Sequence, residues 1–270
     1  MTSLAIYQID AFTTAVFAGN PAAVVPMEAF LPDDLLQRIA LENNLSETAY
    51  LVPAGADRWE LRWFTPTIEV PLCGHATLAS AFLLAEVLGQ AGETMTFATR
   101  QAGDLVVTRE KDGSFAMRLP RRNADGAGDV DAVAAVLGAR PTEVLVIPAT
   151  DDVTLMAVFA TEAEVAALTP DFGAMAGLDA RNVIATAPGD SVDFVSRMFA
   201  PKAGINEDPV TGSAHCSLAP YWAGRLGKTA FAARQISARG GDLTCRLEDD
   251  AVIVAGHAVL YLKGEIAVPG

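Results

Sequence analysis

The stretch Val70-Pro71-Leu72-Cys73-Gly74-His75-Ala76-Thr77 opens a long apolar segment that continues to Leu88. Within the segment after Gly74 and His75, the only polar residues are Thr77, Ser80 and Glu86. A helix that is apolar on every face is buried, so the segment predicts a helix in the protein core. The first turn of such a helix carries backbone N–H groups without intrahelical partners and the positive end of the helix dipole. The sequence therefore places a thiol, a glycine and an imidazole at a helix terminus that can bind an anion.

The length and composition indicate an ordinary globular protein. A chain of 270 residues is long enough for one large domain or two modest ones. Hydrophobic residues make up 51% and charged residues 19%, a balance that argues against a disordered chain. The net charge of −14 argues against nucleic acid and anionic membranes as partners, because both would repel an acidic surface.

Cysteine spacing and the N-terminal sequence favour a reduced, cytoplasmic protein. Cys73, Cys216 and Cys245 are widely spaced and match neither a disulfide framework nor a zinc motif. The first residues lack the basic region of a signal peptide, and no uncharged apolar stretch is long enough to span a membrane. Because no Walker loop, Rossmann fingerprint or metal-spaced ligand set is recognisable, we expect neither a cofactor nor a metal.

Hydrophobic spacing and turn residues predict alternating strands and helices in two successive halves. In the first half we expect strands near 4–11, 22–25, 49–52, 59–64, 94–98, 103–109 and 114–119, and helices over 33–43 and from 74 to 88. In the second half we expect helices over 129–138, within 161–178 and over 213–226, and strands near 143–147, 153–159, 182–186, 192–199, 230–236, 242–247, 250–255 and 258–263.

The two halves share residues as well as element order. Four residues recur 135 positions later: Pro53, Arg62, Phe64 and Pro66 match Pro188, Arg197, Phe199 and Pro201. Farther on, Phe97-Ala98-x-Arg100-Gln101 recurs as Phe231-Ala232-x-Arg234-Gln235. We therefore predict an α+β protein with two pseudo-symmetric halves, 1–120 and 121–270, each a mixed curved sheet or barrel around a central buried helix. The last strand, near 258–263, is able to pack back on the first half.

In this arrangement the polar N-terminal ends of the two central helices are expected to face each other across a cleft, where small-molecule sites tend to lie. Glu47 begins an otherwise apolar strand, at the position where the second half has Asn182. Apolar surroundings raise the pKa of a carboxyl group and suit it to general acid–base catalysis, whereas a solvated glutamate at a strand end is the structural alternative. His75 is balanced between a functional role beside the helix N–H groups and a structural one.

The start of the second central helix and Cys73 each allow two interpretations. Asp208 can cap or orient the start of this helix, and Ser213 can cap it or donate to an anion. A turn followed by an N-cap explains the same composition. Cys73 is either a thiol activated by the helix N-terminus or an ordinary small buried residue.

Taken together, these motifs resemble the PhzF-like phenazine biosynthesis isomerase family. The resemblance is carried by Asp10-Ala11-Phe12, Phe17-Ala18-Gly19-Asn20-Pro21, Leu45-Ser46-Glu47-Thr48-Ala49, Arg62-Trp63-Phe64-Thr65-Pro66, Leu72-Cys73-Gly74-His75-Ala76-Thr77 and the stretch from Glu207 to His215, and it spans essentially the whole chain. It implies a diaminopimelate-epimerase-like fold, a homodimer, and a cofactor-free isomerisation that moves a proton between carbons of a small unsaturated carboxylic acid.

The resemblance also implies roles for individual residues. Glu47 matches the proton shuttle, and the residues that match substrate-binding positions are Asn20, Gly74, His75, Asp208, Gly212 and Ser213. Cys73 matches one of two opposed cysteines in related epimerases and racemases, but the second half has Asp208-Pro209-Val210-Thr211 where the other thiol belongs. We therefore expect an isomerase that uses Glu47. A thiol-based epimerase that uses Cys73 and a non-catalytic metabolite-binding protein are the alternatives.

Overall fold

The computed structural model describes residues 2–148 and 153–269 and divides the chain into two compact units. The first unit comprises Met1–Arg118 and Ala255–Gly270, and the second comprises Leu119–Val254. The predicted boundary after residue 120 lies close to the first change of unit. The predicted second half, 121–270, differs from the second unit because its last segment belongs to the first unit.

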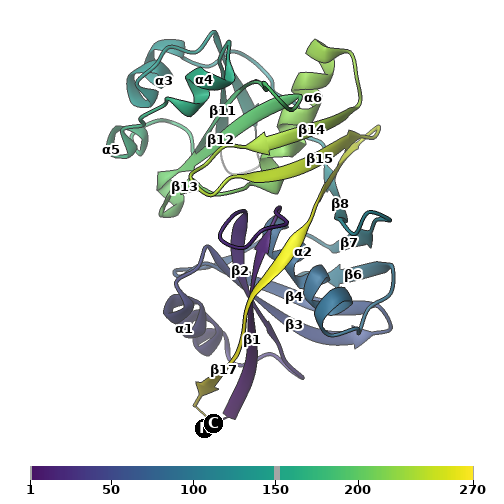
Figure 1. Cartoon of the computed structure of the whole chain (residues 1–270). Coiled ribbons are helices and arrows are strands. Elements are labelled where there is room, and N and C mark those ends of the chain that lie inside the picture. The colour runs from purple at the N-terminus through teal and green to yellow at the C-terminus, as the bar shows by residue number, and fades with distance from the viewer. Residues whose placement is uncertain (1, 149–152, 270) are drawn as a thin grey trace. The chain divides into compact units, whose positions relative to one another are not determined.

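The first unit is a mixed sheet that curves around helix α2. Its strands are β1 (Thr2–Ala11), β2 (Asn20–Pro26), β3 (Glu47–Gly55), β4 (Arg58–Phe64), β5 (Glu69–Val70), β6 (Thr94–Ala98), β7 (Asp104–Arg109), β8 (Phe115–Pro120) and β17 (Ala258–Val268). They pair in the order β17-β1-β2-β3-β4-β6-β7-β8, and only β2–β3 and β4–β6 are parallel. Figure 1 shows β17, the end of the chain, running along β1, its beginning.

Helix α2 (Gly74–Phe82) continues as a π-helical turn (Leu83–Val87) and packs against β1, β2, β3 and β17. Its two buried hydroxyl groups bond back to the preceding turn: Thr77 Oγ1 donates to the Cys73 carbonyl at 2.6 Å and Ser80 Oγ to the Ala76 carbonyl at 2.7 Å. The third polar residue, Glu86, pairs at the surface with Arg109. The predicted core helix is thus confirmed, and each polar exception in it has a partner.

The second unit repeats this topology. Its helices are α3 (Val130–Leu137), α4 (Glu162–Ala166), α5 (Phe172–Met175) and α6 (His215–Leu226), with 3₁₀ turns at Pro201–Ala203 and Gly212–Ala214. Its strands are β9 (Glu143–Pro148), β10 (Val153–Val158), β11 (Asn182–Pro188), β12 (Phe194–Ala200), β13 (Ile205–Asp208), β14 (Ala230–Gln235), β15 (Gly241–Leu247) and β16 (Ala251–Gly256). The parallel pairs are β10–β11 and β12–β14, at the same places in the order as β2–β3 and β4–β6.

The internal repeat predicted from the sequence is confirmed by the register of the strands. Arg62 lies opposite Tyr50, and Arg197 lies opposite Ala185, so both arginines occupy the same position in equivalent strand pairs. The α+β fold class with two similar halves is therefore confirmed. The structure adds the short strands β5 and β13, which are too brief to produce a recognisable alternation of polar and apolar residues.

None of the helices in the described part of the chain combines the length and the apolarity needed to cross a bilayer.

Candidate active site

Three segments of the first unit bring its predicted site residues together. Strands β2 and β3 run parallel, with Ala22 opposite Glu47, so both strands begin at the same edge. Helix α2 contacts both strands, and its first turn follows Cys73. The side chains of Asn20, at the start of β2, and Glu47, at the start of β3, therefore lie beside His75.

His75 is the centre of this cluster. Its Nε2 lies 3.2 Å from Glu47 Oε2, and its Nδ1 lies 3.2 Å from the Asn20 amide nitrogen and 3.4 Å from Cys73 Sγ. Asn20 is fully buried, and Cys73 and His75 are nearly so, whereas the Glu47 side chain keeps 14% of its surface exposed. Glu47 is thus the most exposed side chain of the cluster.

Burial decides the charge state of this imidazole. Removal from water lowers the pKa of His75 to about 3, although its hydrogen bond to the Pro21 carbonyl opposes that shift. At neutral pH the ring is therefore uncharged, and its contact with Glu47 joins a neutral imidazole to a carboxyl group. The hydrogen bond to the Pro21 carbonyl requires that one ring nitrogen carries a proton.

The N-terminus of α2 offers backbone donors next to Glu47 and His75. Cys73 stands at the N-cap with an extended backbone, and no side chain caps this end of the helix. The first backbone hydrogen bond of the helix runs from the Thr77 N–H to the Cys73 carbonyl, at 3.2 Å. The N–H groups of Gly74, His75 and Ala76 come before it and point out of the helix end, where an anionic group can accept from them.

The loop that leads into Asn20 is held in one conformation. The Asp10 carboxylate accepts a hydrogen bond from the Phe17 N–H at 2.9 Å. Gly19 has a φ of +66°, and a side chain there would place its Cβ 2.2 Å from the Ala11 carbonyl oxygen. Only glycine fits at this position, so the backbone itself fixes where the Asn20 amide meets His75.

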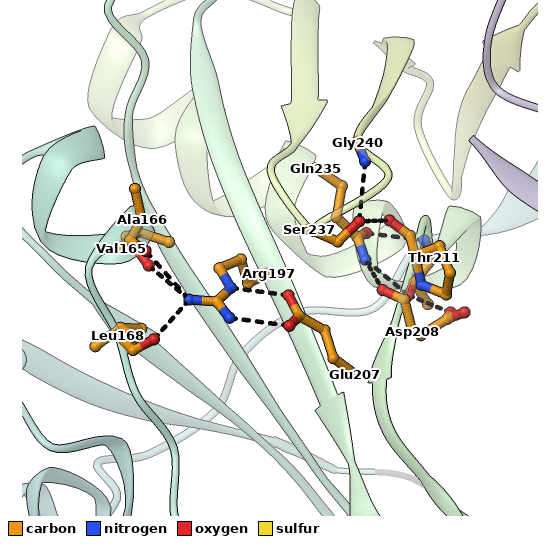
Figure 2. A network of polar contacts seen from close by, with 11 residues as sticks. Val165, Ala166, Leu168, Arg197, Glu207, Asp208, Thr211, Gln235, Ser237 and Gly240 are labelled. Carbon is orange, nitrogen blue, oxygen red and sulfur yellow. Dashed lines mark hydrogen bonds and ion pairs between the residues drawn. The ribbon is translucent and has the colours of Figure 1, made fainter. Parts of the chain in front are cut away.

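The second unit contains its own polar loop, from Asp208 to Ser213, just before α6 (Figure 2). The Asp208 carboxylate accepts a hydrogen bond from the Thr211 hydroxyl. Gly212 is buried and Ser213 is half-buried. Ser213 lies in the 3₁₀ turn, and no side chain caps that turn or α6, so the proposed capping role of Ser213 is wrong.

Gln235 holds this loop and was not singled out by the sequence. Its Oε1 accepts from the Thr211 N–H at 2.8 Å, and its Nε2 donates to the Asp208 carbonyl at 2.6 Å (Figure 2). The signal was available, because Gln235 is a polar residue at the last inward position of the alternating strand β14. Its sequence counterpart, Gln101, lies beyond the end of β6 and is exposed.

Replacing Gln235 with leucine is expected to lower the free energy of unfolding by about 2 kcal/mol or more, because two buried backbone groups lose their partners. Urea unfolding measures this change, and amide hydrogen exchange at Thr211 should quicken in the folded protein. Gln101→Leu is the matched control and should stay within about 0.5 kcal/mol of the wild type. Equal effects of the two substitutions would contradict a special role for Gln235.

His215 begins α6 in a fully buried position. Its Nδ1 lies 2.9 Å from the Thr211 carbonyl oxygen, so that nitrogen carries the proton. Desolvation is the larger influence and lowers the pKa of His215 to about 4, against the opposing effect of this hydrogen bond. His215 is therefore neutral at physiological pH and serves as a packing residue beside Phe194.

This shift makes stability depend on pH. Below pH 6.5 the unfolded chain binds a proton at His215, whereas the folded chain does so only near pH 4, so acid favours unfolding. His215 should thereby contribute about 2.5 kcal/mol to the loss of stability between pH 7 and about pH 4.5. Urea unfolding of His215→Gln at both pH values should show a correspondingly smaller loss than the wild type. An identical loss in both proteins would contradict the assignment.

The remaining cysteines lie in the second unit and are poor nucleophiles. Cys216 and Cys245 are buried free thiols, as is Cys73. Burial raises the pKa of Cys216 to about 12 and raises that of Cys245 further. Neither is a thiolate near neutral pH, so neither supplies the second thiol of a two-cysteine racemase.

Comparison with known proteins places this geometry in a family. The family model described as phenazine biosynthesis-like protein matches residues 9–264. An uncharacterised isomerase from Pseudomonas aeruginosa is 50% identical over 263 residues, which cover 97% of this chain and 98% of that protein. A crystal structure of a PhzF-family phenazine biosynthesis protein from Enterococcus faecalis has a TM-score of 0.92 and 46% identity, and covers 99% of this chain and 100% of that one.

A more distant neighbour shares the fold alone. The structure of a probable proline racemase from Agrobacterium radiobacter aligns with a TM-score of 0.66 at 11% identity, over 98% of this chain and 93% of that one. The epimerase-like fold expected from the sequence is therefore confirmed.

Proposed function

Because the chain belongs to the phenazine biosynthesis-like protein family, we propose that it is an isomerase that moves a proton between carbons of a small cyclic or unsaturated carboxylic or amino acid. Glu47 acts as both general base and general acid. The single observation that carries this proposal is the partly exposed Glu47 side chain, whose Oε2 lies 3.2 Å from a buried, neutral imidazole.

The proton transfer follows from what these groups can do. The Glu47 carboxylate removes a proton from a carbon next to the unsaturated system, and the substrate becomes a delocalised anion. Glu47, now a carboxylic acid, returns the proton to a different carbon, so the enzyme ends in its starting state. His75 stays neutral, and its Nε2 lies 3.2 Å from the carboxylate. No redox change occurs, so the reaction as proposed needs no cofactor.

Substrate binding is assigned to backbone donors and to residues of both units. The N–H groups of Gly74 and His75 stabilise the substrate carboxylate or the negative charge that develops during transfer. From the second unit, Asp208, Gly212 and Ser213 bind the substrate, as the family resemblance implies. Asn20 acts through His75, because its side chain is fully buried and its amide nitrogen is 3.2 Å from Nδ1. A homodimer in the cytoplasm remains part of the prediction.

A thiol-based epimerase is the second candidate, and one observation favours it. Cys73 Sγ lies 3.4 Å from His75 Nδ1 at a helix N-terminus, so a neutral imidazole and backbone N–H groups stand beside the thiol. Cys73→Ser separates the two mechanisms. Under the proposed mechanism this variant keeps most of the activity, whereas a thiol mechanism requires that activity be lost.

The proposed function is tested by isotope exchange without knowledge of the natural substrate. The wild-type protein is incubated in heavy water with a panel of cyclic and unsaturated carboxylic and amino acids, and deuterium uptake is followed by NMR. Uptake into at least one compound at a carbon position is the expected result. Tight binding of panel members with no exchange into any of them would instead support a non-catalytic metabolite-binding protein.

A further inference from the structure

Glu47, Cys73 and His75 offer three different ligand types in one place. One ligand atom from each side chain, a carboxylate oxygen, a sulfur and an imidazole nitrogen, can be chosen so that all three lie within 4.8 Å of one another. Two separations are shorter but reach different nitrogens of the ring, 3.2 Å from Oε2 to Nε2 and 3.4 Å from Sγ to Nδ1. In residues 2–148 and 153–269, this is the only group of three such ligands that meets this spacing.

The donor set, a sulfur, an imidazole nitrogen and a carboxylate oxygen, suits a borderline-soft divalent cation. Zinc bonds to thiolate sulfur at about 2.3 Å and to imidazole nitrogen or carboxylate oxygen at about 2.0–2.2 Å, so its tetrahedral ligands lie roughly 3.3–3.7 Å apart. We propose that Glu47, Cys73 and His75 form a Zn²⁺ site whose occupation blocks proton transfer by Glu47. Three protein ligands leave a fourth position open for water, as in zinc sites that exchange ligands.

His75 provides a separate reason to expect an ion here. Its Nε2 is buried and, although 3.2 Å from Glu47 Oε2, makes no hydrogen bond of acceptable geometry with the described residues. A zinc ion takes only one nitrogen of a ring, so binding through Nε2 requires the Cys73 side chain to rotate from the Nδ1 side. This rotation involves one short side chain with a single torsion before the sulfur.

The surroundings supply the support that a ligating histidine needs. Such a histidine usually donates its other N–H to a carbonyl or carboxylate, which fixes the ring orientation. His75 hydrogen-bonds to the Pro21 carbonyl, and the Asn20 amide lies 3.2 Å from Nδ1 and can present its oxygen by rotating. The net charge of −14 also attracts cations to the protein at long range.

Zinc binding does not depend on the proposed isomerase function, but the inhibition does. Bound zinc would occupy the carboxylate that removes the substrate proton and the imidazole that positions it. Metal binding and isotope exchange are therefore measured separately. If the protein does not bind zinc, isotope exchange by the metal-free protein is still expected. If the protein does not catalyse exchange, zinc binding is still expected.

The zinc site is tested first by binding. The full-length protein is freed of metal with a chelator and titrated with Zn²⁺ in a calorimeter, and one ion per chain is expected. Cys73→Ser and His75→Gln should each weaken binding by at least about 100-fold, since even the loss of an outer-shell partner costs 10–100-fold. His257→Gln, at a half-buried histidine outside the cluster, is the matched control and should bind zinc like the wild type.

A spectroscopic measurement identifies the ligand directly. Cobalt(II) added in place of zinc should produce a thiolate-to-metal charge-transfer band in the wild type and in Cys216→Ser, but not in Cys73→Ser. Absence of the band from the wild type, or zinc affinity unchanged in Cys73→Ser, would overturn the site. Saturating Zn²⁺ should also stop isotope exchange, and a chelator should restore it. Undiminished exchange in the zinc-saturated protein would overturn the inhibitory role.

Discussion

Glu47→Gln is expected to slow isotope exchange and turnover by about 10²- to 10⁴-fold, the usual contribution of a positioned general acid or base. The glutamine side chain has nearly the same volume and keeps a polar contact with His75 Nε2, 3.2 Å away in the wild type. It can neither accept a proton from carbon nor return one. The loss should therefore appear in kcat, with little change in KM, because substrate binding is left to other groups.

The matched control for this substitution is Glu42→Gln, the same change at an exposed position on helix α1 (Asp33–Asn43). It should leave both kinetic constants unchanged, and circular dichroism should show both variants folded. A rise in KM with kcat unchanged in Glu47→Gln would assign Glu47 to substrate binding and not to proton transfer.

Arg62→Met is expected to destabilise the protein by about 3 kcal/mol or more, because it breaks a buried ion pair and leaves Glu69 with the longer, 3.5 Å pair to Arg100. Arg62 is only 2% exposed, and its guanidinium makes two hydrogen bonds to Glu69, at 2.8 and 2.7 Å, and one to Asp33 at 2.9 Å. It also lies over the rings of Phe30 and Phe64. Methionine keeps much of the packing volume but leaves Glu69 without its main charge partner. Urea unfolding at pH 7 measures the change.

Two further variants isolate the cause of this effect. Arg58→Met removes an arginine of the same strand whose pair with Asp104 is solvent-exposed, and it should cost less than about 1 kcal/mol. The double variant Arg62→Met with Glu69→Met also removes the Glu69 carboxylate and should recover part of the lost stability. Similar losses for Arg58→Met and Arg62→Met would show that burial of the pair is unimportant.

Arg62 and Arg197 also show how much of the fold could be predicted from the sequence. The identity of Arg62 and Arg197 was visible as a repeat, and both residues indeed bind a glutamate on the next short strand. The glutamates themselves were not identified as equivalent, because Glu69 follows Arg62 by 7 residues and Glu207 follows Arg197 by 10. An unequal loop removes the constant offset on which the detection of a repeat depends.

The contacts within the candidate site could not be predicted from the sequence either, for a different reason. Glu47 and His75 were each singled out by local pattern, but their contact depends on the parallel pairing of β2 with β3 and on the packing of α2 against both. Periodicity predicts that strands exist without revealing which strands pair. Gln235 was missed because its first-half counterpart, Gln101, is exposed beyond the end of β6 and has no such role.

The central claim is that Glu47 carries the proton from one carbon to another, and exchange in heavy water tests it most directly. The rates of deuterium uptake into one active compound are compared for the wild type, Glu47→Gln and Cys73→Ser, all free of metal. The account predicts uptake by the wild type and by Cys73→Ser and a loss of at least about 10²-fold in Glu47→Gln. Undiminished uptake by Glu47→Gln, with uptake abolished in Cys73→Ser, would contradict it and move the chemistry to the thiol.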